Sequence, residues 1–107
     1  MFEVEYAILP SEPSLAFKVQ YLIEIVEKEL GEVCKVVKVG ASLICAPNEN
    51  VLVLVYTRFN ESRQLSAYLK LQSYNAIQIV EIINKLSSAL RRNGYVITLA
   101  TSSSTLV

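Results

Sequence analysis

The stretch "AYLKLQSYNAIQIVEIINKL", residues Ala67 to Leu86, carries the strongest periodic signal in the chain. At about 100° per residue, the apolar side chains in and around it fall on one side of a helix, and most of the charged ones fall on the other. The same phase holds from residue 63 to residue 92, so the pattern predicts one helix of about 30 residues. Asn60 is the expected N-cap and Gly94 the expected terminator. The segment "QLSAYLKLQ" also alternates as a strand would, but the longer helical phase is the preferred interpretation.

Upstream, the sequence predicts a strand followed by a helix. Phe2–Leu9 alternates apolar and acidic side chains at its start, as a half-buried strand does. Ser11 is a possible N-cap, and Pro13 suits the first turn of the helix that follows. An apolar stripe continues from there to about Leu30, where Gly31 provides a stop.

Between the helices, extended structure is expected. Glu32–Pro47 is rich in β-branched residues, with Gly40 as a bulge or tight turn. Asn48–Asn50 is a turn. Val51–Thr57 opens with six consecutive apolar residues, which indicates a strand buried on both faces. One face would pack on the helices, and the other needs a cover that a small domain often finds in another chain. Tyr95–Thr101 is the last expected strand.

These segments give an α+β fold in the order β-α-β-β-α-β, with two helices packed on one face of an antiparallel sheet. The chain has 107 residues, which fits a single domain over residues 1–101, and residues 102–107 are expected to be a flexible tail.

The amino-acid composition excludes several classes of function. There is no His and no Asp, which excludes a Ser-His-Asp triad and His-metal chemistry. Positive and negative residues number 10 each. Residues 1–50 hold eight Glu and four Lys, and residues 51–107 hold six Lys or Arg and two Glu. The molecule is therefore either bipolar, and suited to an acidic partner, or mixes these charges on one surface when it folds.

The two cysteines, Cys34 and Cys45, lie eleven residues apart without a CxxC motif, and free buried thiols in a reducing cytoplasm are expected. No apolar run is long enough to span a membrane, and the acidic N-terminus is unlike a secretory signal. We therefore expect a cytoplasmic protein without a catalytic motif, cofactor or metal site.

Gln72 lies in the middle of the apolar side of the predicted helix. It is either a core amide bonded to a neighbouring carbonyl or an interface amide that fixes a partner and its register. A second set of residues combines cations and aromatic rings, as in proteins that hold phosphates and stack bases. The candidate nucleic-acid-binding residues are Arg58, Arg63 and Lys70, interleaved with Tyr56, Phe59 and Tyr68.

The stretch "FNESRQLSAYLKLQSYNAI" resembles the second helix of the small dimerising subunit of the KEOPS/EKC complex, the CTAG-related family. Glu61 stands in the preceding loop, and Leu71-Gln72-Ser73-Tyr74 matches a Leu-Asn-Ser-Tyr pattern with Gln72 at the amide position. Lys70 replaces an expected Arg, and the C-terminal strand is extra.

The resemblance implies a non-catalytic scaffold subunit of a complex that makes threonylcarbamoyl-adenosine in tRNA. Its partners would be a second copy or a paralogue and the catalytic ATPase subunit, with a possible tRNA contact and no membrane. The implied partner-binding residues are Tyr68, Gln72, Ser73 and Tyr74. The alternatives are a ferredoxin-like regulatory domain that binds a small ligand, although the loop "LPSEPS" has no Gly, and a small nucleic-acid-binding protein.

Overall fold

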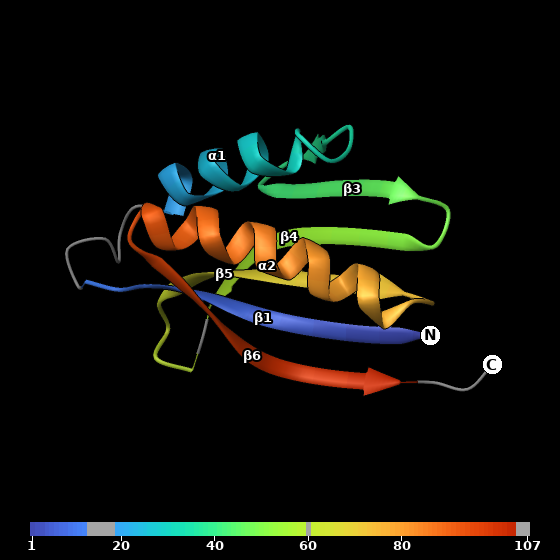
Figure 1. Cartoon of the computed structure of the whole chain (residues 1–107). Helices are drawn as coiled ribbons and strands as arrows, with labels where there is room; N and C mark the ends of the chain where they lie inside the picture. The colour runs from blue at the N-terminus through green and yellow to red at the C-terminus, as the bar shows by residue number, and fades with distance from the viewer. Residues whose placement is uncertain (13–18, 60, 105–107) are drawn as a thin grey trace.

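The chain folds into one antiparallel sheet of six strands with two helices (Figure 1). The computed structural model describes residues 1–12, 19–59 and 61–104. The strand order across the sheet is β2-β3-β4-β5-β1-β6. The elements are β1 (Phe2–Pro10), α1 (Val19–Leu30), β2 (Val37–Val39), β3 (Ser42–Asn48), β4 (Val51–Phe59), β5 (Leu65–Ser73), α2 (Ala76–Arg92) and β6 (Tyr95–Ser104). The predicted α+β class is confirmed, and the order along the chain contains two strands more than expected.

The largest difference from the prediction is β5. The long helix predicted over residues 63–92 is wrong in its first third, because Leu65–Ser73 is a strand and the helix begins only at Ala76. β5 pairs with β4 on one side and β1 on the other. Ala67, Leu69 and Leu71 point into the core and are almost completely buried. The helical phase through this segment was a coincidence of spacing that two rows of interstrand hydrogen bonds outweigh.

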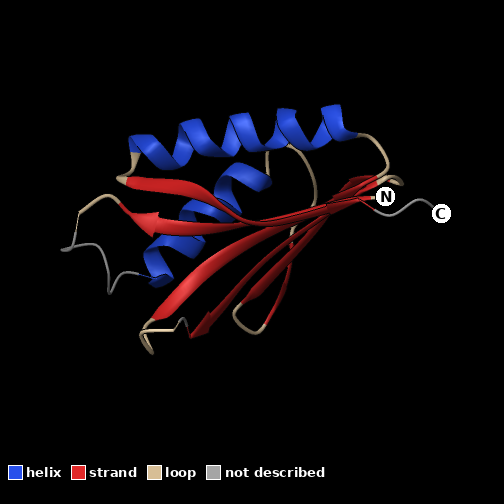
Figure 2. Ribbon diagram, turned by 90° about the horizontal axis from the view of Figure 1, so that it is seen from below, coloured by secondary structure: helices blue, strands red, loops and turns tan. Residues whose placement is uncertain are grey.

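Both helices pack on one face of the sheet, as predicted. α1 contributes Leu22, Ile23, Val26 and Leu30 to the core, and α2 contributes Ile79, Leu86, Ala89 and Leu90. They meet alternate side chains of the strands, such as Val53 and Val55 of β4, which are fully buried. Figure 2 shows the strongly twisted sheet with α2 lying along one side of it. No helix of the described residues is long and apolar enough to cross a membrane.

β4 is not buried on both faces, which corrects a second prediction. Val51, Val53 and Val55 are buried beneath the helices, whereas Leu52 and Leu54 on the opposite face are partly exposed. No element of the described residues covers that second face. The apolar run therefore reflects one face in the core and one face left open.

The predicted turns are largely confirmed. Gly40 joins β2 to β3 with a φ of 61°, in the left-handed region that glycine tolerates. The turn after β3 is closed by Asn50, whose N–H donates to the Asn48 side chain at 2.8 Å. Gly94, with a φ of 88°, follows α2 as expected. Ser11 donates through its hydroxyl to the Gly94 carbonyl at 2.8 Å, which ties the end of β1 to the α2–β6 turn.

Three further predictions concern residues in or next to the segments that the structure does not describe. Pro13, which was predicted for the first turn of the first helix, lies outside the described residues, and so does Asn60. β6 runs to Ser104, three residues beyond the predicted strand, so the flexible tail predicted over residues 102–107 is wrong for residues 102–104. Residues 105–107 lie outside the described part.

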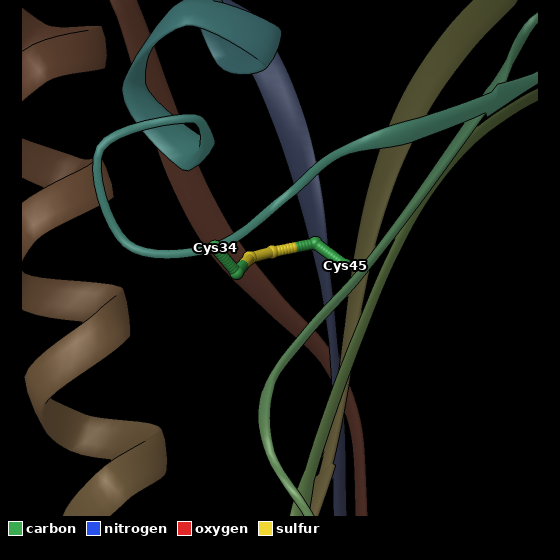
Figure 3. The surroundings of a disulfide bond; sticks show 2 residues. All are labelled: Cys34 and Cys45. Carbon is green, nitrogen blue, oxygen red and sulfur yellow. A yellow bond between two sulfur atoms is a disulfide. The ribbon is translucent and has the colours of Figure 1, made fainter.

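Cys34 and Cys45 are joined by a disulfide, so the prediction of free thiols is wrong (Figure 3). Cys34 lies in the loop after α1 and Cys45 in β3, and their Cα atoms are 5.9 Å apart, within the range that a disulfide spans. The reversal of the chain at Gly40 brings together two residues that are eleven positions apart.

The start of α2 gives a test of the corrected fold. The Asn75 side chain accepts from the Ile77 N–H at 2.9 Å, so Asn75 is the N-cap of α2. We expect Asn75→Ala to lower the free energy of unfolding by about 1 kcal/mol, and Asn75→Asp, which keeps the cap, to change it little. Inside a longer helix the same Ala would stabilise by about 0.5 kcal/mol, so the sign in urea unfolding decides between the two. A stabilised Ala variant would contradict the β5–α2 boundary.

The disulfide gives a second test. Closing a loop of eleven residues should stabilise the fold by about 2–3 kcal/mol, because the unfolded chain loses freedom. Urea unfolding of the same protein with and without reductant measures this difference without creating a cavity. The double variant Cys34→Ala/Cys45→Ala is the control and should not respond to reductant. Rapid alkylation of both cysteines in the folded, unreduced protein would contradict the bond.

Candidate functional site on the open face of the sheet

The face of the sheet opposite the helices carries two adjoining groups of side chains. Their places follow from the register, in which Glu5 pairs with Lys70, and Lys70 with Leu54. The first group, here called the charged network, comprises Glu3, Glu5, Tyr56, Arg58, Tyr68, Lys70 and Gln72. The second group, here called the apolar strip, comprises Val37, Val39, Ile44, Leu52 and Leu54.

One half of the charged network is built around Glu5. Its carboxylate accepts from the Arg58 Nη2 at 3.1 Å and from the Tyr56 hydroxyl. The Arg58 guanidinium also lies over the Tyr68 ring, with its carbon 4.1 Å from the ring centroid. Tyr56 and Tyr68 stack with centroids 5.8 Å apart. This packing explains why Tyr68 is only 7% exposed on a face that no described element covers.

The other half is built around Glu3. Lys70 Nζ lies 3.0 Å from one carboxylate oxygen, and Gln72 Nε2 donates to the other at 2.9 Å. The hydrogen bond from Lys70, followed by the one from Gln72, holds the pKa of Glu3 below its usual value. Gln72 is therefore neither a core amide nor a residue in a helix seam. It is an outward-facing strand residue that supports a carboxylate of the neighbouring strand.

The network mixes the charges of the two halves of the sequence. Glu3 and Glu5 come from the acidic half, and Arg58 and Lys70 come from the basic half. Another pair, Lys85 with Glu32 at 3.5 Å, joins the halves in the same way on the helix side. The interpretation that folding mixes the charges therefore fits these contacts better than a bipolar molecule does.

The hydrogen bonds of the charged network set the acidity of its Tyr56 phenol. Burial, followed by the hydrogen bond to Glu5, raises the pKa of Tyr56 to about 12, so its phenol is a weaker acid than usual. No group of three or more His, Cys, Asp or Glu able to hold a metal ion occurs in the part of the chain that the structure describes. The two cations each lie within 3.1 Å of a carboxylate, which offsets their attraction for phosphate.

The apolar strip lies beside the network on β2, β3 and β4. Val37 pairs with Ile44, and Ile44 pairs with Leu54, so these three form one row across three strands. Val37 is 52% exposed and Val39 is 58% exposed, which is unusual for clustered β-branched residues on a sheet. The strip is a set of hydrophobic side chains held in a rigid frame without a cover from the described chain.

The structure separates the remaining predicted site residues. Ser73 is fully buried and accepts from the Asn75 N–H at 2.9 Å, so it stabilises the turn before α2. Tyr74 is 65% exposed in that turn. Arg63 lies in the loop between β4 and β5, where it lines a cavity on the helix side. Of the predicted sets, Arg58, Lys70, Tyr68 and Gln72 come together on the open face.

Sequence reasoning missed the apolar strip and the two carboxylates of the network. The alternation in Phe2–Leu9 predicts that Glu3 and Glu5 share one strand face, but nothing in the sequence shows which cations meet them. The signal available for the strip was the alternation of exposed and buried positions, and six consecutive apolar residues in β4 conceal that alternation.

No family model matches this chain, and no curated protein matches it either. A de novo designed protein with a ferredoxin fold, solved by solution NMR, is similar in structure. The TM-score is 0.50 at 16% identity, over 94% of this chain and 84% of the designed one. At that identity the likeness shows the fold alone, which is a ferredoxin-like arrangement of the α+β class.

The raised pKa of Tyr56 predicts a dependence of stability on pH. Because the folded-state pKa is about 12 and the ordinary value is about 10, the protonated phenol is favoured in the folded state. This contribution is fully present below pH 10 and is lost as the pH rises through 12. We expect unfolding free energy to fall by about 1–3 kcal/mol more in the wild type than in Tyr56→Phe over this range.

Urea unfolding of both proteins at intervals from pH 9 to pH 12 measures this difference. Tyr95, whose pKa burial also raises, is present in both proteins and cancels from the comparison. Parallel pH profiles would contradict a buried, Glu5-bonded phenol at residue 56.

Proposed function

We propose that this protein is a non-catalytic interaction domain that forms a homodimer by packing the open faces of two sheets together. The uncovered apolar strip is the observation that carries the proposal. Its five apolar side chains on three neighbouring strands are more than half exposed in β2 and partly exposed in β3 and β4, and burying them against a like surface is favourable.

A second copy is the partner that suits this face best. In a two-fold dimer the same patch meets itself, so the patch must be self-complementary. In such a dimer the apolar side chains of one strip contact those of the other, so no charged group is buried between them. Beside them, the network holds two Glu, one Arg and one Lys in close pairs, so two copies bring no net charge together.

A narrower proposal is that the dimer is the scaffold subunit of a KEOPS-type tRNA-modification complex. It rests on the sequence resemblance alone, because Gln72 and Tyr74 lie on β5 and the following turn and not on a helix. Binding of the purified protein to the catalytic ATPase subunit of such a complex tests it separately from the dimer. Nucleic-acid binding through Arg58, Arg63 and Lys70 likewise stays a prediction.

A cytoplasmic location belongs with these proposals, but the disulfide weighs against it. Structural disulfides persist mainly in oxidising compartments, and the intracellular proteins of hyperthermophiles are the main exception. Trapping of thiols in intact cells of the native host shows whether Cys34 and Cys45 are oxidised where the protein works.

Leu54 lies in the middle row of the strip and is the residue to change. We expect Leu54→Glu and Leu54→Lys each to weaken self-association by at least tenfold in sedimentation equilibrium, because like charges would meet across the two-fold axis. An equimolar mixture of the two variants should associate again. Val80→Glu is the matched control, since Val80 is 55% exposed on α2, on the other side of the sheet, and should leave association unchanged.

A wild-type protein that is monomeric at high micromolar concentration would overturn the proposal. So would a dimer that both Leu54 variants leave intact, because the contact would then lie elsewhere, for example along the ten-residue edge of β6. Circular dichroism of each variant confirms that the fold is retained.

A further inference from the structure

A cavity of about 660 Å³ lies on the helix side of the sheet, away from the open face. It is formed by the end of β1, the start of α1, the β2–β3 turn and the hairpin that joins β4 to β5. This volume lies within the range of about 300–1,000 Å³ that small-molecule sites occupy. The side chains of Ile8, Leu22, Ile23 and Leu43 give it an apolar wall.

The charged side chains around the cavity are both cations. Lys38 and Arg63 both line it, and none of the described residues in its lining has a carboxylate. Lys38 is partly neutralised, because its Nζ lies 3.1 Å from a carboxylate oxygen of Glu27 on α1. Arg63 makes no ion pair with any other described residue, so its guanidinium is the cation left for an anion in the cavity.

Tyr95, which also lines the cavity, has an unsatisfied hydroxyl. Its side chain is only 2% exposed, and the hydroxyl has no hydrogen-bond partner in the part of the chain that the structure describes. Buried hydroxyl groups are almost always bonded, because an unpaired one costs free energy. The hydroxyl oxygen has almost no accessible surface, so an acceptor atom of a molecule bound in the cavity would remove that cost after a small movement of the neighbouring side chains.

Arg63 has an unusual backbone. Its φ of 60° lies in the left-handed region, where it is the only non-glycine residue among those described. Such strained positions gather where a side chain must be presented to a ligand. Arg63 therefore combines a strained backbone, a cation without an ion pair among the described residues and a place in the cavity wall.

We propose that the cavity binds a single-chain amphipathic carboxylate, with its apolar chain against the wall and its carboxylate on the Arg63 guanidinium. A planar guanidinium binds a carboxylate through two parallel hydrogen bonds, which suits this head group. The hydroxyl of Tyr95 donates to a polar atom of the same ligand. This inference is independent of the proposed dimer, because the open face lies on the other side of the sheet.

Isothermal titration of the protein with dodecanoate tests the site. We expect one saturable site per chain, with affinity rising about fourfold for each methylene from octanoate to dodecanoate. Dodecanol, which has the same chain without the charge, should bind at least tenfold more weakly, and dodecyltrimethylammonium should not compete. Absence of saturable binding, or equal binding of all three head groups, would overturn the proposal.

Two variants assign the residues. Arg63→Asn removes the cation but tolerates the left-handed backbone, and should weaken dodecanoate binding about tenfold. Arg91→Asn is its matched control, because Arg91 is exposed on α2 and does not line the cavity. Tyr95→Phe should weaken binding several-fold while raising the Tm of the free protein by ~4 °C, since the unpaired hydroxyl is gone. A lower Tm would show that this hydroxyl is satisfied without a ligand.

The Leu54→Glu variant separates this proposal from the dimer. Leu54 points to the open face, so the variant should bind dodecanoate as the wild type does. Normal binding by a monomeric Leu54→Glu supports the cavity whatever the state of the dimer. Loss of binding in that folded variant would overturn the independence of the two sites and with it the proposal as stated.

Discussion

The pairing of β5 with both of its neighbours is the constraint on which the rest of this structure depends. Residues 65–73 supply hydrogen bonds to β4 and to β1 at the same time, and without them the sheet would divide into two separate pieces. A helix over the same residues would leave the facing edges of β4 and β1 without partners, which is costly for strands whose inner sides are buried. The local helical tendency is worth only a few tenths of a kcal/mol per residue, so the sheet prevails.

That pairing also explains what the sequence could and could not predict. The class, the two-helix face and the turns at Gly40 and Gly94 followed from local signals that no distant contact opposes. The role of Gln72 did not follow from local signals. It depends on the alternation of side chains along a strand and on a hydrogen bond to Glu3, a residue 69 positions away. The disulfide was missed for a similar reason, since only the reversal of the chain at Gly40 makes Cys34 and Cys45 neighbours.

The two faces of the sheet have different chemistry because side chains alternate along every strand. On the helix side the alternate residues of β4 and β5 are almost all apolar and make the core. On the open side β4 carries strip residues in its first half and network residues in its second half, whereas β5 carries only network residues. The network fixes the side chains of Tyr56 and Arg58 through Glu5, so this face presents a defined surface to a partner with little conformational freedom left to lose.

β2 contributes side chains both to the proposed dimer surface and to the proposed ligand cavity. It is only three residues long, and its side chains alternate between them: Val37 and Val39 belong to the apolar strip, whereas Lys38 between them lines the cavity. Such a short edge strand has few hydrogen bonds of its own, and within the described part of the chain it pairs with β3 alone. The disulfide from Cys34, three residues upstream, fixes the chain to β3 at a second point. This cross-link therefore holds one wall of the cavity and one edge of the dimer surface in place, which is a structural reason for a disulfide at this position.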